Sequence, residues 1–130
     1  MQSSAKEFSV WRRLLGGADA EILLLGGSAS AGSGISTPSR SYGRVLVDDL
    51  NRRVAAAAPP ASQPGRLSLR NLAQGSTRTP WATQIMLDEA RDPSVGLVVW
   101  EYAMNDAYFC SEWSVLRRTV QTFLEKLGAM

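Results

Sequence analysis

Histidine is missing from this sequence of 130 residues. Its absence removes the commonest general base near neutral pH, the commonest zinc ligand and the usual partner of a catalytic serine or cysteine. Cysteine is almost as scarce, since Cys110 stands alone; an internal disulfide is excluded and a reducing compartment is favoured. With no histidine to activate it, and with Phe109 beside it, Cys110 is expected to be a half-buried structural residue.

Long apolar runs and basic tracts are lacking too. No run approaches the roughly 20 residues of a membrane-spanning helix, and the opening stretch MQSSAKEFSVWRRLLGGADA lacks the continuous apolar segment of a secretory signal. The formal net charge is only +2, and the basic residues occur as scattered pairs. We expect a soluble chain with no membrane span and no nucleic-acid partner, whose compartment the sequence leaves unknown. The acidic residues lack EF-hand spacing, and neither a cofactor nor a metal is expected.

The patterns that are present indicate a globular α/β domain. Apolar residues make up 45% of the chain and charged residues 20%. Strand patterns alternate with helical ones, and the segment AMNDAYFCSEW before the last helix is expected to be a loop. This alternation predicts a three-layer, flavodoxin-like parallel sheet in the order 2-1-3, truncated before its last strands. The predicted strands lie at residues 22–25, 66–71 and 92–102, and the helices at residues 42–57, 79–91 and 113–127.

The chain is expected to form one partial domain over residues 1–130, with residues 1–19 as an N-terminal extension. Three unusual loops, GGSASAGSG, NLAQGST and AMNDA, follow its predicted strands. They share the carboxyl edge of the sheet, where ligand crevices form in open α/β folds. The first loop fails two phosphate motifs, because Ser33 stands where a P-loop needs lysine and Thr37 stands where a dinucleotide motif needs glycine. A looser anion cradle, a serine nucleophile on a tight turn and a simple flexible loop stay open for this segment.

The second and third loops favour the nucleophile. Gly75 offers a backbone amide and Asn105 a side-chain amide, which are the donors that an oxyanion hole uses. At this point the chain resembles the SGNH hydrolases, the GDSL-type esterases and lipases. The family's first block, Gly-Asp-Ser-Leu-Thr-x-Gly, is similar to residues 26–32, although Gly27 replaces the aspartate and Ala29 the leucine. Its second block resembles residues 71–75, and its third, Gly-x-Asn-Asp, resembles residues 103–106 with Ala103 in place of glycine.

The resemblance implies a role for each matching residue. Ser28 is the expected nucleophile of a serine esterase acting on a small-molecule ester or acetylated carbohydrate. The amides of Ser28 and Gly75 and the side chain of Asn105 are the expected oxyanion donors. Asp106 is expected to hold its loop by hydrogen bonds.

The sequence departs from the family at the fourth block, Asp-x-x-His, which supplies the base and its orienting carboxylate. A serine hydroxyl is a poor nucleophile until a neighbour takes its proton. Asp48, Asp49 and Asp106 are too weakly basic to substitute. We therefore expect the N-terminal part of an esterase, inactive as it stands.

Two rival functions stay open. The chain could be a non-catalytic interaction module that self-associates through the uncovered edge of its third strand, because an open apolar edge invites pairing. It could instead be a phosphate-binding α/β half-domain that uses residues 26–34.

Overall fold

The computed structural model describes residues 10–109 and 112–128, so the expectation for Cys110 lies outside the described residues. Three strands alternate with helices along the chain, as the sequence predicts. The elements are α1 (Val10–Leu15), β1 (Ala20–Gly26), α2 (Ser28–Ala31), the short 3-10 helix η1 (Pro38–Arg40), α3 (Tyr42–Ala57), β2 (Leu67–Asn71), α4 (Thr79–Ile85), α5 (Leu87–Arg91), β3 (Val95–Glu101), α6 (Ala103–Phe109) and α7 (Trp113–Gly128).

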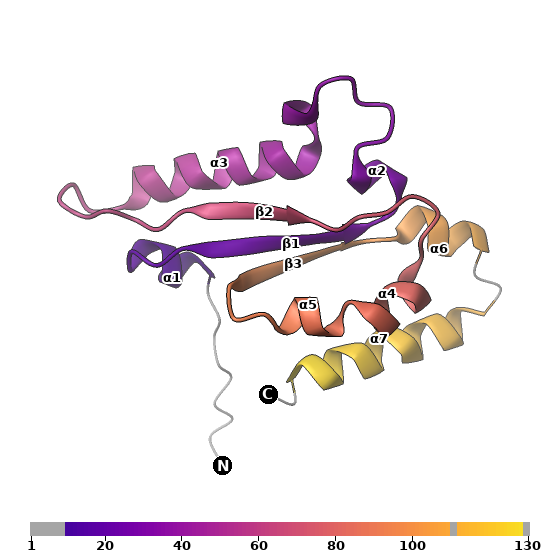
Figure 1. Cartoon of the computed structure of the whole chain (residues 1–130). Coiled ribbons are helices and arrows are strands. Elements are labelled where there is room, and N and C mark those ends of the chain that lie inside the picture. Colours follow the sequence, from indigo (N-terminus) through magenta and orange to yellow (C-terminus); the bar gives the residue numbers. More distant parts are fainter. Residues whose placement is uncertain (1–9, 110–111, 129–130) are drawn as a thin grey trace, which may run out of the picture.

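The three strands form one parallel sheet with β1 in the middle, in the order β2-β1-β3 (Figure 1). Leu24 of β1 lies between Asn71 of β2 and Val99 of β3 in the register. The predicted α/β class and strand order are thus confirmed. Because the strands are parallel, the segments that follow them meet at one end of the sheet, where α2, α4 and α6 begin (Figure 1).

Successive residues of β1 pack into different layers. Ile22 belongs to a buried cluster with Val47 and Val54 of α3, whereas Leu23 and Leu25 belong to a cluster with Ala82 of α4. Helix α3 lies on one side of the sheet and α4, α5 and α7 lie on the other (Figure 1). Side chains alternate between the faces of a strand, and burying each leucine contributes roughly 1.5–3 kcal/mol. This two-sided burial makes β1 the rigid support of the turn that follows it.

The structure differs from the predicted elements in several places. The expected loop AMNDAYFCSEW contains helix α6, and the helix predicted from residue 79 to 91 is broken at Met86, whose φ and ψ are −100° and 7°. Helix α1 was not predicted, and its Leu14 is fully buried. In α7, Phe123 is buried as its apolar face predicts, but Trp113 is 59% exposed.

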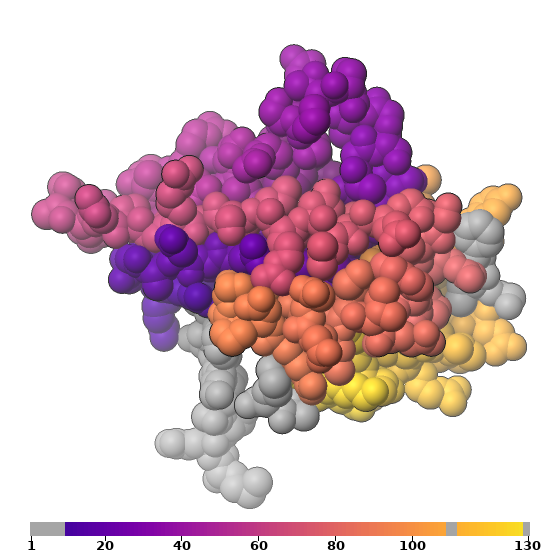
Figure 2. Space-filling view, viewed as in Figure 1, coloured from indigo at the N-terminus to yellow at the C-terminus, as the bar shows by residue number. Residues whose placement is uncertain are grey.

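The surface of the described residues has a lobe near the carboxyl end of the sheet. The segment between α2 and α3 stands out as a purple lobe beside the carboxyl end of the sheet (Figure 2). Within residues 10–109 and 112–128, none of the helices has the length and apolar character to cross a membrane.

Candidate active site

Ser28 lies on a tight turn between the central strand and a short helix. Strand β1 ends at Gly26, Gly27 caps α2 with φ −83° and ψ −155°, and Ser28 is the first residue of that helix. Helix α2 ends one turn later at Gly32, whose φ of 89° is a left-handed conformation that favours glycine. Ser28 is exposed, whereas Ser30 on the same helix is only 1% exposed. The turn therefore presents the Ser28 side chain to solvent and holds Ser30 inside.

Asn105 lies directly against this turn. It is the third residue of α6, immediately after β3, and its Nδ2 atom donates a hydrogen bond to the Thr77 carbonyl at 2.7 Å. A Cβ atom on Gly27 would come within 2.6 Å of that Nδ2 atom, so a side chain there would require the Asn105 amide to shift. This contact gives a physical reason for Gly27 at the position where the SGNH block has aspartate. A primary amide carries two protons, so a second N–H of Asn105 is available to a ligand.

Gly75 lies close to Ser28. A Cβ atom built on Gly75 would be 3.8 Å from the Ser28 Cβ atom. The loop that carries Gly75 is tied to the end of β1, because the Gln74 amide donates to the Gly26 carbonyl at 3.0 Å. Thr77 Oγ1 lies 3.3 Å from the same oxygen and donates to the Gln74 carbonyl at 2.5 Å. The fold thus brings Ser28, Gly75 and Asn105 together, although their catalytic roles stay predictions.

A small pocket of about 200 Å³ opens at Ser28. Met104 is 75% exposed at this place, whereas Tyr102 is 2% exposed. Gly75 is beside Ser28 but does not line the pocket, and a larger, more open groove of about 720 Å³ between α4 and α7 includes none of the predicted site residues. The pocket is lined by Gly27, Ser28, Ala29, Ser33, Glu101, Tyr102, Met104 and Asn105.

Two ionisable residues of this pocket were missed by the sequence analysis. Glu101 is the last residue of β3, and its Oε2 atom accepts a hydrogen bond from Ser30 Oγ at 2.9 Å. Burial raises the pKa of Tyr102, and hydrogen bonding to Thr77 and to the Gly26 backbone opposes that rise. A carboxylate that ends an apolar strand, four residues before Asn105, was the signal that could have drawn attention to Glu101.

Asp106 holds the neighbouring helix in place. This carboxylate is 7% exposed and accepts hydrogen bonds from the Thr79 amide at 3.0 Å and from Thr79 Oγ1 at 2.6 Å. The same Thr79 hydroxyl accepts a bond from Trp100 Nε1 at 2.9 Å. Asp106 therefore anchors the start of α4 to α6. The sequence resemblance implied such a hydrogen-bonding role for it.

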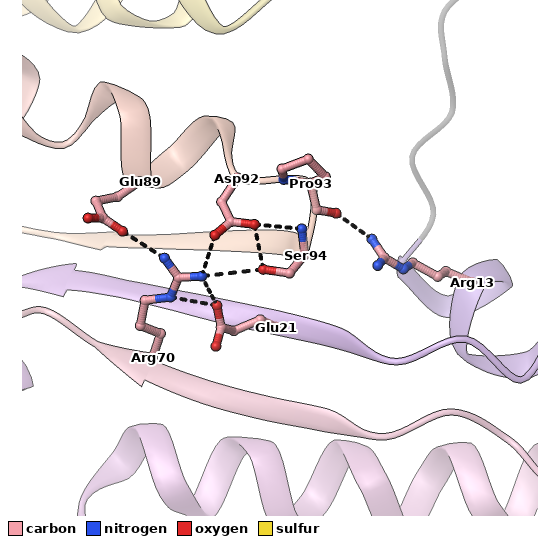
Figure 3. A network of polar contacts seen from close by, with 7 residues as sticks. All are labelled: Arg13, Glu21, Arg70, Glu89, Asp92, Pro93 and Ser94. Atoms are coloured by element: carbon pink, nitrogen blue, oxygen red, sulfur yellow. Dashed lines mark hydrogen bonds and ion pairs between the residues drawn. The ribbon is translucent and has the colours of Figure 1, made fainter.

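The largest group of charged side chains lies away from the pocket, beside the amino ends of β1 and β3 (Figure 3). Arg70 of β2 forms ion pairs with Glu21, Glu89 and Asp92. Its hydrogen bond to Asp92, with that to Glu21 next in weight, raises the pKa of Arg70. The same bond, assisted by Ser94, holds the pKa of Asp92 well below its ordinary range. The network joins β1, β2 and α5. We call this group of ion pairs the Arg70 clamp, because it holds these elements together.

Among the described residues, no three His, Cys, Asp or Glu side chains are grouped so that they could hold a metal ion.

Comparison with known proteins gives matches at the level of structure. Neither a protein-family model nor a curated protein matches the chain. AlinE4, an SGNH-hydrolase family esterase, superposes with a TM-score of 0.65 and 22% identity over 87% of this chain. EstA, a psychrotrophic esterase from Pseudoalteromonas sp. whose structure is described as inhibited by monoethylphosphonate, superposes with a TM-score of 0.62 and 18% identity over 85% of it. The chain spans 55% of the length of each of these proteins.

A parallel sheet in the order β2-β1-β3 with helices on both faces (Figure 1) defines a doubly wound α/β fold. More specifically, the likeness to AlinE4 and EstA shows that the chain has an SGNH-hydrolase-type fold, as the sequence resemblance implied.

Proposed function

We propose that this chain carries the nucleophile and the oxyanion donors of a serine hydrolase that cleaves small-molecule esters, acetylated carbohydrates included. The observation that carries the proposal is the placement of Ser28. Its exposed side chain opens into a pocket shared with Asn105, and the Gly75 loop passes beside it. Three convergent groups of these types suit attack on an ester carbonyl and stabilisation of the resulting oxyanion.

In the proposed reaction, Ser28 Oγ attacks the ester carbonyl carbon and a bond forms between them. The carbonyl oxygen becomes an oxyanion and accepts hydrogen bonds from the Ser28 and Gly75 amides and from Asn105 Nδ2. The bond to the alcohol oxygen then breaks, the alcohol leaves with a proton, and water hydrolyses the acyl-serine. Because Asn105 is already held by Thr77, its amide is oriented before the substrate arrives.

Attack by Ser28 requires a base to take its proton, and this sequence contains no histidine. An oxyanion hole and binding alone leave a residual acceleration of roughly 10³ to 10⁴ over water. We therefore propose that the base belongs to residues outside this sequence and that the chain alone hydrolyses esters very slowly. Extending the reading frame beyond residue 130 should reveal an Asp-x-x-His block.

A phosphonate reagent tests the nucleophile directly. EstA is described as inhibited by monoethylphosphonate, so a fluorophosphonate probe is the matched choice. In a form extended by its own downstream sequence, the probe should modify Ser28, as located by peptide mass spectrometry, and the chain of 130 residues should react far more slowly. Ser28→Ala should abolish labelling, and Asn105→Ala should slow it by about 10²-fold.

Two results would contradict the proposal. Labelling that persists in Ser28→Ala would place the nucleophile elsewhere. Fast labelling of the chain of 130 residues would show that the base lies within it.

The open edge of β3 supports a second candidate function. Among the described residues β3 has a strand neighbour on one side only, and Leu97 at its middle is 38% exposed. We propose that this edge lets the chain associate with a second copy of itself.

A further inference from the structure

Three side chains form a directed hydrogen-bond chain on the inner side of the Ser28 turn. Ser30 Oγ donates to Glu101 Oε2 at 2.9 Å and lies 2.6 Å from the Tyr42 hydroxyl oxygen. A serine hydroxyl has one proton. Since that proton goes to the carboxylate, the Tyr42 hydroxyl must donate to Ser30. The hydrogen bonds therefore run from Tyr42 through Ser30 to Glu101.

These hydrogen bonds connect α2 with α3 and β3. Tyr42 is the first residue of α3, Ser30 belongs to α2, and Glu101 ends β3. The backbone of Ser30 is held as well, because Asn71 Nδ2 donates to its carbonyl at 2.9 Å. A Cβ atom on Gly26 would overlap Ser30 Oγ, so glycine at the end of β1 makes the room that Ser30 occupies. Ser30 is therefore fixed by both its side chain and its carbonyl.

We propose that Ser30 is a positioning residue for the site, an inference that rests on the proposed function of Ser28. Ser28 and Ser30 lie two positions apart on a four-residue helix, so fixing the inner residue fixes the direction in which the outer one points. The same bond keeps the Glu101 carboxylate engaged on the inner side of the turn. Glu101 also lines the pocket with Asn105. Without its hydrogen bond from Ser30, the negatively charged Glu101 carboxylate would be free to turn into the pocket and oppose a developing oxyanion.

Hydrogen exchange of the backbone amides in residues 27–33, followed by mass spectrometry on the chain as it is, tests the positioning directly. Ser30→Ala should speed exchange there by about fivefold, the equilibrium equivalent of one ordinary hydrogen bond. Tyr42→Phe should have a smaller effect, because the bond to Glu101 remains. Ser36→Ala is the matched control, since Ser36 is exposed in the neighbouring segment and lies outside the hydrogen-bond chain.

Rescue by a second substitution distinguishes positioning from simple stabilisation. Ser30→Ala should slow fluorophosphonate labelling of Ser28, and Glu101→Gln added to Ser30→Ala should restore much of the lost rate, because a neutral amide does not repel the oxyanion. A purely structural role predicts no such rescue.

The possible outcomes separate the two proposals. Exchange in residues 27–33 of Ser30→Ala that equals wild type, or that changes only in proportion to global unfolding in urea, would overturn the positioning of Ser30. If the double variant labels no faster than Ser30→Ala, the proposed repulsion between Glu101 and the oxyanion would be wrong. Absence of Ser28 labelling even in the extended form would instead contradict the proposed function, and the exchange measurement would still decide the positioning.

Discussion

At the scale of single residues, Gly27 lies where a side chain would press against Asn105. Replacing it with alanine would put a Cβ atom 2.6 Å from Asn105 Nδ2, so either the amide or the turn must move. Overpacking of this kind costs about 1–3 kcal/mol of unfolding free energy. We expect Gly27→Ala to lower the free energy of unfolding, measured by urea denaturation, by that amount and to slow labelling of Ser28, because Asn105 is displaced.

Gly128→Ala is the matched control for this substitution. A Cβ atom there has no heavy atom within 4 Å, so its effect should stay within about 0.5 kcal/mol. A Gly27→Ala variant that unfolds and reacts as wild type would show that Asn105 does not lie against the turn.

The predicted site residues and the missed ones differ in the range of the interactions that define them. Ser28, Gly75 and Asn105 could be found from the sequence because each lies in the segment that follows a strand, and parallel strands bring their carboxyl ends together. Glu101 and Ser30 meet across 71 positions of the chain, and no local pattern encodes that bond. The need for glycine at position 27 likewise depends on where Asn105 comes to lie.

At the scale of elements, periodicity was enough to predict the strands and their order but not every helix. The continuous apolar pattern of β1 corresponds to burial on both faces of that strand. The alternating pattern of β2 corresponds to burial on one face. Helix α6 was predicted as a loop because Asn105 and Asp106 are typical loop residues. In the fold their side chains bond to Thr77 and Thr79 of another segment, so they do not compete with the helix backbone.

The charged network around Arg70 gives an element-scale prediction, because it fixes the turn between α5 and β3 to the two other strands (Figure 3). The pKa of Asp92 is lowered from its ordinary value of 3.8, first by its hydrogen bond from Arg70 and then by Ser94. A carboxylate whose pKa is lower in the folded state stabilises the fold above its unfolded pKa, and this contribution is lost as the pH falls toward the folded pKa.

We therefore expect the urea midpoint to fall as the pH is lowered from about 4.5 to about 2, and Asp92→Asn to flatten that fall. The variant should be less stable than wild type at the upper end of this range and should approach it at the lower end. Asp48→Asn, at an exposed position of α3, serves as the control. An acid limb that is equally steep in Asp92→Asn would contradict the clamp.

At the scale of the whole molecule, the two edges of the sheet differ. On β2, Asn51 of α3 bonds to both backbone groups of Leu67, donating to the carbonyl at 3.0 Å and accepting from the amide at 2.8 Å. That side chain occupies part of the β2 edge as a neighbouring strand would. On β3 the continuous run VGLVVW has no charged residue before Glu101. Association is therefore expected at β3, where edge protection by charge or covering is lacking in the described residues.

A twofold pairing of two β3 edges would bury the same surface on both copies and close the assembly at a dimer. We expect light scattering to show a dimer, and the melting temperature to rise across about two decades of protein concentration, because mass action stabilises the associated state. Leu97→Lys puts a charge on that edge at a residue that is already 38% exposed, and it should shift the population to monomer. Ile85→Lys, at a 51% exposed site on α4, is the matched control and should leave the dimer intact. A wild-type monomer with a concentration-independent melting temperature would exclude pairing through β3, and equal loss of dimer in both lysine variants would place the contact elsewhere.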